Sequence, residues 1–295
     1  SHKLNIETSA QPYSFGNFAT MLKASEFGKD FLWGVAISAL QNEGACTDGG
    51  RGPSIWDAFS KRRGKIKDSH KPWSACDFYH RYKDDLLLAK ALGFSVFRFS
   101  ISWSRILPEG TGSINKEGVA FYHKLIDECL VLGLTPFITL YHWDLPLALE
   151  KEGGWAGYHI QKWFARFVSV CADEYGSKVK DWIVLNEPAG FTSLGYMLGK
   201  HAPGKRDMSL FLSAMHNAAL AQAEGGRLLR SKIKKARIGT TFSCSEVVPF
   251  TESKEDKAAA EKIDLLLNRL FVEPALGRGY PHIEGFWLTE KLHMH

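Results

Sequence analysis

The sequence predicts an α/β fold of the (β/α)8 TIM-barrel type, with only about the first five β/α units present in this chain. Apolar segments as long as strands alternate five times with segments whose apolar residues recur at helical spacing, as in a parallel sheet with helices outside. Polar side chains follow three of these strands, at the ends where barrel active sites lie. An open, doubly wound sheet is the alternative, but Gly49-Gly50 lies in a loop without the GxGxxG pattern of dinucleotide-binding folds.

Each element follows from its own pattern. Residues 31–38 form an unbroken apolar run, which indicates a strand covered on both faces. Residues 77–92 place apolar side chains at helical spacing, and Gly93 supplies the stop. The same order then repeats, with strands expected over residues 95–100, 135–141, 181–186 and 236–243, and helices over residues 116–132, 158–175, 209–231 and about 258–270.

Three segments are expected along the chain. Residues 1–26 form a flexible lead-in, residues 27–281 the partial barrel, and residues 282–295 a tail of atypical sequence. Five units cannot close an eight-stranded barrel, so we expect the chain on its own to expose two sheet edges and to be unstable. A truncated or alternatively spliced product, a second chain that completes the barrel, and a missing C-terminal half are all open explanations.

Composition and charge favour an ordinary globular protein. The chain is 45% hydrophobic and 23% charged, and its net charge of +5 is spread along the sequence. A local basic cluster is typical of a solvated helix end, so we expect no nucleic-acid partner. Its members are Lys232, Lys234, Lys235 and Arg237. No apolar run approaches the ~18 residues of a membrane span, so no membrane partner is expected either.

The cysteines predict a reducing compartment. They are odd in number, scattered and without a CxxC pair, which favours free buried thiols over disulfides or a zinc site. No metal or organic cofactor is expected. The N-terminal stretch lacks the apolar core of a signal peptide, so we expect a cytoplasmic location unless a leader was removed.

Glu187 is the first candidate for chemistry. It follows Asn186 at the end of the apolar strand over residues 181–186, a position that suits an acid protonating a leaving group. The plainer interpretation is a carboxylate that starts a helix. Glycoside hydrolysis usually requires a second carboxylate, so Glu187 needs a partner.

Three further positions share this end of the predicted sheet. His142 and Trp143 combine a hydrogen-bonding ring with an aromatic face, which fits the hydroxyl edges and apolar faces of a sugar, although core or surface packing is the plainer alternative. Gln41 offers a donor and an acceptor for adjacent hydroxyls, or simply caps a loop. Arg98 lies in a strand that should be buried, so it predicts an internal carboxylate partner.

Together these segments resemble the glycoside hydrolase family 1 β-glucosidases, from about residue 27 to residue 281. The matching strings are Phe31-Leu32-Trp33-Gly34, Ser38-Ala39 with Gln41 and Glu43-Gly44, Gly52-Pro53-Ser54-Ile55-Trp56-Asp57, residues 97–106 (FRFSISWSRI), residues 141–146 (YHWDLP) and Asn186-Glu187-Pro188. The resemblance implies hydrolysis of a β-glycoside with retention.

In that family pattern Glu187 is the general acid and base. Gln41, His142 and Trp143 would hold the sugar, Asn186 would contact its 2-hydroxyl, and Arg98 would support the nucleophile. Plant thioglucosidases carry Gln at the position of Glu187, so this chain resembles the branch that keeps its proton donor. Trp182, Phe191 and Phe242 are candidates for an aglycone site, but core packing is favoured for each.

The resemblance stops short of the second carboxylate. The family's nucleophile lies in a Thr-Glu-Asn-Gly string, which does not occur in this chain. Thr289-Glu290 has a similar start, but Lys291 replaces the Asn, so Glu290 is rejected as nucleophile. A catalytically inactive sugar- or protein-binding relative, similar to the klothos, is therefore the alternative to a β-glycosidase. The sequence does not choose between glucosides, galactosides, glucosylceramide-type and 6-phospho substrates.

Overall fold

The computed structural model describes residues 23–292, and the chain divides into two compact units, Ser1–Leu32 and Trp33–His295. The described part of the first unit contains the 3-10 helix η1 (Ala24–Phe27), near which the rings of Phe27 and Phe31 pack at 5.1 Å. Residues 1–22 of the expected lead-in and residues 293–295 of the expected tail lie outside the described residues. The division of the chain at residues 26 and 281 stays a prediction.

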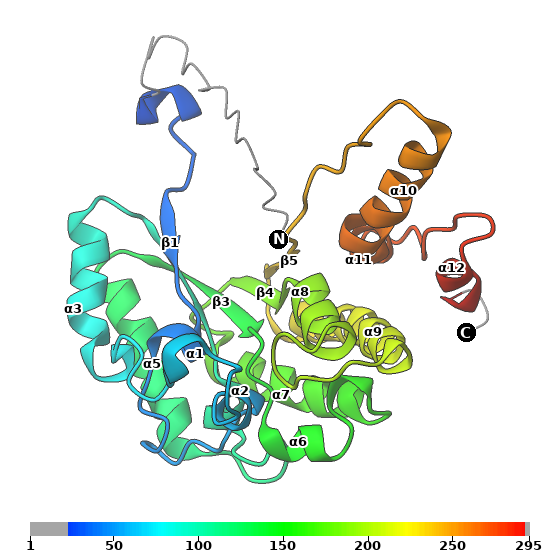
Figure 1. Cartoon of the computed structure of the whole chain (residues 1–295). Coiled ribbons are helices and arrows are strands. Elements are labelled where there is room, and N and C mark those ends of the chain that lie inside the picture. The colour runs from blue at the N-terminus through cyan, green and yellow to red at the C-terminus, as the bar shows by residue number, and fades with distance from the viewer. Residues whose placement is uncertain (1–22, 293–295) are drawn as a thin grey trace, which may run out of the picture. The chain divides into compact units, whose positions relative to one another are not determined.

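The second unit is built on one parallel sheet of five strands (Figure 1). The strands are β1 (Gly34–Ala36), β2 (Val96–Ser100), β3 (Thr135–Tyr141), β4 (Asp181–Asn186) and β5 (Arg237–Thr241). Their order in space equals their order in sequence, and each neighbouring pair is parallel. This confirms the predicted fold class, because sequential parallel strands are the arrangement of a partial (β/α)8 barrel.

Helices connect the strands and add shorter pieces around them. The helices are α1 (Ala39–Asn42), α2 (Ile55–Phe59), η2 (Lys67–Ser69), α3 (Phe78–Ala91), α4 (Trp103–Ile106), α5 (Lys116–Val131), α6 (Leu147–Lys151), η3 (Gly154–Ala156), α7 (Ile160–Tyr175), α8 (Pro188–Thr192), the π-helix η4 (Ser193–Met197), α9 (Met208–Lys232), α10 (Lys254–Asp264), the π-helix η5 (Leu265–Arg269), α11 (Leu270–Ala275) and α12 (Trp287–Leu292). Four of the five predicted helices, α3, α5, α7 and α9, begin and end within two residues of their expected limits. The fifth, expected at about residues 258–270, is divided among α10, η5 and α11.

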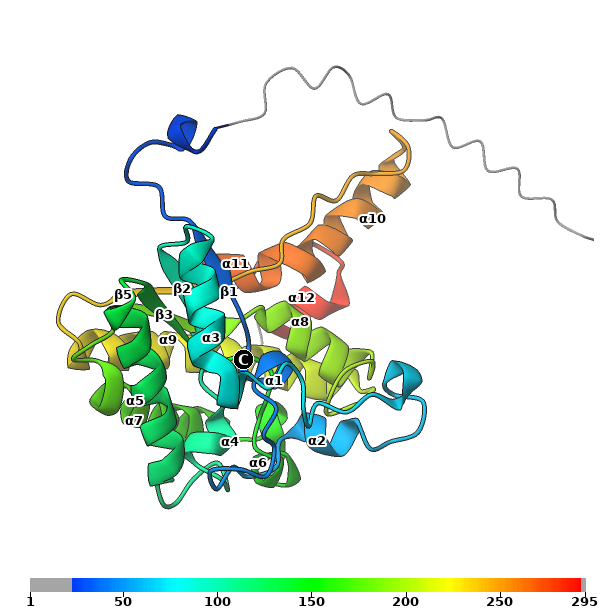
Figure 2. The same ribbon diagram turned by 90° about the vertical axis from the view of Figure 1, so that its left-hand side faces the viewer.

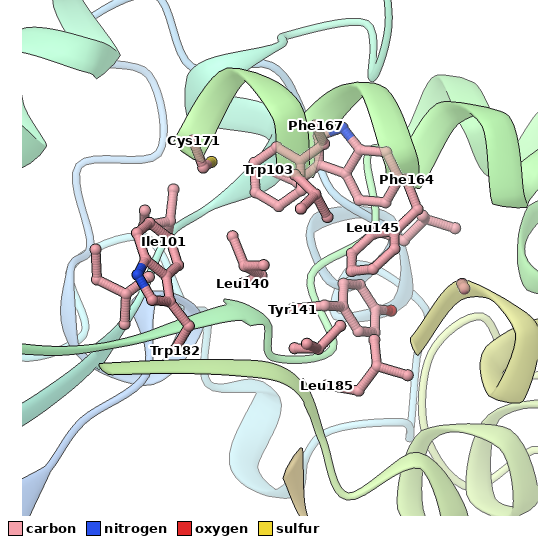
Figure 3. Packing of buried hydrophobic residues seen from close by; sticks show 14 of the residues in the cluster. Ile101, Trp103, Leu140, Tyr141, Leu145, Phe164, Phe167, Cys171, Trp182 and Leu185 are labelled. Carbon is pink, nitrogen blue, oxygen red and sulfur yellow. The ribbon is translucent and has the colours of Figure 1, made fainter. Parts of the chain in front are cut away.

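The long helices pack on one another in chain order. α3 and α5 run side by side in both views, and α7 packs against α9 (Figures 1 and 2). Between α5 and α7 the Tyr175 hydroxyl donates to the Val119 carbonyl at 3.3 Å. The core lies between these helices and the strands, where Trp103 stacks on Phe167 with ring centroids 4.9 Å apart (Figure 3). Burial of large aromatic and aliphatic side chains here fixes the strands that carry the site.

The two outer strands differ from the prediction. β1 is three residues long rather than eight, and Phe31, Leu32 and Trp33 before it are exposed. β5 is also partly exposed along its length. In the described sheet β1 pairs with β2 and β5 pairs with β4, so each presents one open edge. The expectation of a first strand covered on both faces is wrong because the covering layer at that edge is missing from the described residues.

The thiols are free, as expected, but only two are buried. Cys129 and Cys171 lie in the core, whereas Cys46 is half-buried and Cys76 and Cys244 are exposed. Within residues 23–292 no helix is long and apolar enough to cross a membrane.

Candidate functional site

All six residues singled out from the sequence line one cavity of about 530 Å³. It lies where β1, β3 and β4 end, because parallel strands in register bring their carboxyl ends to the same edge of the sheet. The predicted lining residues are Gln41, Arg98, His142, Trp143, Asn186 and Glu187. Four further lining residues were not predicted from the sequence, namely Ser38, Leu40, Trp56 and His201.

Asn186 holds the centre of this site together. Its Oδ1 accepts hydrogen bonds from Arg98 Nη2 at 2.5 Å and from Thr241 Oγ1 at 2.9 Å. Its backbone carbonyl accepts one from Trp143 Nε1 at 2.8 Å. These contacts fix the oxygen end of the amide on the protein, so its NH2 end is the part that can donate to a ligand.

Glu187 occupies an uncommon backbone conformation. Its φ of 48° and ψ of 67° lie in the left-handed region, which costs a non-glycine residue roughly 1–2 kcal/mol. The conformation is held by the Glu187 amide, which donates to Thr241 O at 3.0 Å, and by α8, which begins at Pro188. The Glu187 carboxylate makes no capping hydrogen bond to α8. The plainer interpretation, a carboxylate that serves to start a helix, is therefore not supported.

Trp143 shares this feature, with φ at 77°. Its indole packs against α8 so closely that a Cβ on Gly190 would lie 2.6 Å from Trp143 Cζ2. The ring of His201 also packs against it, with centroids 5.5 Å apart, and the ring of Trp56 lies 5.4 Å from that of His201. Strained backbone conformations, here at Glu187 and Trp143, cluster at ligand-binding and active sites, and close aromatic packing holds them in place.

Gln41 is positioned by short local contacts. α1 follows β1 directly, and the Ala39 amide donates to Ser100 Oγ at 2.7 Å, which ties α1 to the end of β2. Ser38 Oγ donates to Gln41 Oε1 at 2.8 Å. The Gln41 amide nitrogen is thus the end that can reach a ligand acceptor.

A buried ion pair anchors the chain just after Gln41. Arg105 Nε donates to Glu43 Oε2 at 3.0 Å, and the Tyr122 hydroxyl donates to Glu43 Oε1 at 2.6 Å. Burial, followed by the Glu43 charge, raises the pKa of Tyr122, so its proton stays on the hydroxyl. This network was not predicted from the sequence, although Glu43 and Arg105 both lie in segments that resemble the family.

Arg98 is half-buried rather than buried, and its direct partners are not carboxylates. Besides Asn186 it donates from Nε to Thr139 Oγ1 at 2.9 Å. Burial lowers the pKa of Arg98, and the charge of Glu187 opposes that shift. The expected internal carboxylate is therefore present as Glu187, but it acts through space and the hydrogen bonds go to a hydroxyl and an amide.

His142 is uncharged at neutral pH. Burial, and after it the positive charge of Arg98, together lower its pKa from 6.5 to about 4. Its Nδ1 is buried and has no hydrogen-bond partner among the described residues. A neutral ring with one unsatisfied nitrogen can donate to or accept from a hydroxyl group.

The remaining candidates are placed away from this chemistry. Trp182 and Phe191 are buried in the core and Phe242 packs against it, as favoured from the sequence. Glu290 is exposed on α12 and does not line the cavity. In the part of the chain that the structure describes, no group of three His, Cys, Asp or Glu side chains is arranged to hold a metal ion.

The family model for glycosyl hydrolase family 1 matches residues 23–292. The chain belongs to glycosyl hydrolase family 1. Beta-glucosidase A of Thermotoga maritima is 41% identical over 263 residues, which are 89% of this chain and 59% of that protein. Beta-glucosidase 42 of Arabidopsis thaliana is 41% identical over 289 residues, which are 95% of this chain and 57% of that protein.

Solved structures of this glycosyl hydrolase family show the same fold. A beta-glucosidase from Thermotoga maritima in complex with deoxynojirimycin superimposes with a TM-score of 0.83 at 43% identity, over 85% of this chain and 57% of that one. The same enzyme in complex with glucoimidazole gives 0.84 at 42% identity, over 86% and 58%. The chain thus spans somewhat less than three fifths of the length of these solved relatives.

Proposed function

We propose that this chain carries the acid/base half of a retaining β-glucosidase active site. The observation that carries the proposal is the shared cavity: the residues that the sequence predicts for sugar chemistry come from four strands and the turns after them, and they line one space of about 530 Å³. The names of the family relatives favour a β-glucoside as substrate.

Glu187 protonates the glycosidic oxygen as the leaving group departs and then removes a proton from the incoming water. Its carboxylate is available for this because the start of α8 does not use it as a cap. Asn186 contacts the 2-hydroxyl through its NH2 end, and such a contact can lower the barrier by several kcal/mol, roughly, when it tightens in the transition state. Gln41, His142 and Trp143 hold the sugar.

A second carboxylate is still required. Among the described residues Glu187 is the one acidic side chain that lines the cavity. Arg98, half-buried beside Asn186, brings a positive charge to the face where a nucleophilic carboxylate would be stabilised. In our proposal the nucleophile comes from the rest of the barrel or from a second chain, and the 295-residue chain alone does not turn over. A cytoplasmic location belongs to the same proposal.

Turnover of aryl β-glucosides tests this function. We expect no hydrolysis by the chain alone, and hydrolysis when the C-terminal portion of a family 1 barrel is supplied. In the active preparation Glu187→Gln should lower kcat/KM, which reports release of the aryl group, by about 10²–10⁴-fold for an aryl group of high pKa, and by less for an activated aryl group that leaves without a proton. The matched control is Glu290→Gln, which removes an exposed carboxylate outside the cavity and should leave the rate of hydrolysis unchanged. Failure of the supplied portion to give any turnover would overturn the enzyme proposal.

A binding protein without catalysis is the second candidate. The observation that favours it is the single carboxylate in the cavity. Titration with gluconolactone separates the two: binding that persists in a completed barrel without turnover supports the binding protein, whereas turnover excludes it.

A further inference from the structure

A second cavity, of about 1000 Å³, lies between the loop after α1 and the start of α3. It shares no lining residue with the cavity of Glu187. The residues that matter for its chemistry are Asp48, Arg51, Asp57, Trp73, Asp77 and His80. The proposed function leaves all six without a role.

The floor of this second cavity is a buried, incompletely bonded ion pair. Arg51 Nη2 lies 3.0 Å from Asp57 Oδ2, and their side chains are only 5% and 9% exposed. Ser54 adds two donors to the same Oδ2, from its amide at 2.6 Å and its hydroxyl at 2.8 Å. Asp57 Oδ1 is buried and has no hydrogen-bond partner in the described chain. A buried carboxylate oxygen without a donor is costly, so this atom favours a ligand that brings an O–H or N–H group.

The three carboxylates around the second cavity are already paired, and Lys61 is a further charged side chain that lines it. His80 lies between two carboxylates, with Nε2 3.3 Å from Asp48 Oδ2 and Nδ1 2.7 Å from Asp77 Oδ1. With Asp57 held by Arg51, each of the three carboxylates already has a cationic or imidazole partner. A neutral ligand rich in hydroxyl groups suits such a wall better than an ion, because it can use the remaining lone pairs without adding net charge.

Trp73 supplies an apolar surface. It is 48% exposed, and its ring already holds the ammonium group of Lys71 at 5.8 Å from the centroid. An aromatic face beside unsatisfied acceptors matches a sugar, which presents C–H faces and hydroxyl edges. We propose that the second cavity binds a neutral β-linked glucan oligosaccharide, with Trp73 against a sugar face and Asp57 Oδ1 accepting a hydroxyl. The choice of a β-glucan rests on the proposed function, whereas the chemistry of the cavity does not.

Fluorine NMR of the full chain labelled with 5-fluorotryptophan tests this site directly. The chain has nine tryptophans, and the Trp73 resonance is the one absent from the spectrum of Trp73→Phe. On titration with cellobiose the Trp73 resonance should shift and saturate. The control is Trp287, which is 45% exposed and likewise lies beside a lysine, Lys291, and its resonance should stay in place. An unchanged Trp73 resonance at millimolar cellobiose would overturn the proposal.

Two variants separate this site from the proposed active site. In calorimetry with cellobiose, Trp73→Ala should lose the binding that the Trp73 resonance reports, and Trp287→Ala should keep it.

The Trp56 and Trp143 resonances report the cavity of Glu187 independently, so shifts there without a Trp73 shift refute the second site alone. A Trp73 shift without any at Trp56 or Trp143 refutes the proposed function alone. Equal binding by Trp73→Ala and the parent chain would also contradict the second site.

Discussion

His142 and Asp144 are two residues apart after β3, and their pKa values move in opposite directions. Burial lowers the pKa of His142 from 6.5 to about 4, helped by the charge of Arg98. Burial raises the pKa of Asp144 from 3.8 to about 7, against smaller opposing effects of Ser102 and Arg51. Both groups are therefore uncharged in the folded chain over much of the range between pH 4 and 7.

These shifts predict opposing pH dependences of stability. Between pH 4 and 6.5 the unfolded chain holds a proton on His142 that the folded chain lacks, so this residue makes the free energy of unfolding rise with pH. Between pH 3.8 and 7 the folded chain holds a proton on Asp144 that the unfolded chain lacks. This residue therefore makes the free energy of unfolding fall as pH rises. Each slope is at most about 1.4 kcal/mol per pH unit.

Urea unfolding of two variants at a series of pH values checks this. Relative to the parent chain, Asp144→Asn should become steadily more stable as pH rises from 4 to 7, and His142→Gln should become steadily less stable from pH 4 to 6.5. Variants whose stability runs parallel to that of the parent at every pH would show that neither pKa is shifted.

At the scale of single elements, α9 contains two adjacent glycines with different surroundings. A Cβ on Gly225 would lie 2.9 Å from Val184 Cγ1 on β4 and 3.3 Å from Phe164 on α7, whereas a Cβ on Gly226 meets nothing closer than 3.9 Å. Close approach of α9 to the sheet therefore depends on Gly225, and Gly226 only weakens the helix.

Alanine at each position gives a matched pair. Gly225→Ala should destabilise the chain by about 1–3 kcal/mol through overpacking between α9, β4 and α7. Gly226→Ala should stabilise it by about 0.5–1 kcal/mol, because alanine has the higher helix propensity. Thermal unfolding of both variants measures the difference, and equal shifts in Tm would contradict the packing described for α9.

The long elements were predictable and the short ones were not. β3 and β4 have the limits expected from their apolar runs, since burial on both faces leaves an unmistakable pattern. α1 and α8 are four and five residues long, too short to show a helical period, and tertiary contacts define them. The same is true of the candidate site. Its residues at strand ends were predictable from the apolar runs before them, whereas His201 lies in a loop after η4 and no local sequence pattern indicates that it lines the cavity.

At the scale of the molecule, the described sheet has two open edges and exposed apolar groups beside them. β1 and β5 each pair on one side. On α3, which follows β1, Leu88 and the adjoining Leu92 are more than half exposed and lie four residues apart on one helix face. An open edge with an apolar face beside it favours contact with further protein.

We therefore predict that the 295-residue chain self-associates as its concentration rises. Leu88→Glu combined with Leu92→Glu should reduce the association seen in sedimentation velocity, because charge replaces the apolar face of α3. Leu276→Glu, an equally exposed leucine outside α3, should leave it unchanged. A chain that stays monomeric at all concentrations would contradict the prediction, as would equal effects of the two substitutions.

We propose that the cavity of Glu187 binds the sugar of a β-glucoside, and calorimetric titration of the folded chain with gluconolactone is the decisive test. We predict saturable binding that Asn186→Ala weakens strongly, because in our proposal the removed amide contacts the 2-hydroxyl. Asn268→Ala, on η5 outside the cavity, should bind as the parent chain does. Absence of binding to the folded parent chain, or equal binding by both variants, would contradict sugar binding in the cavity of Glu187.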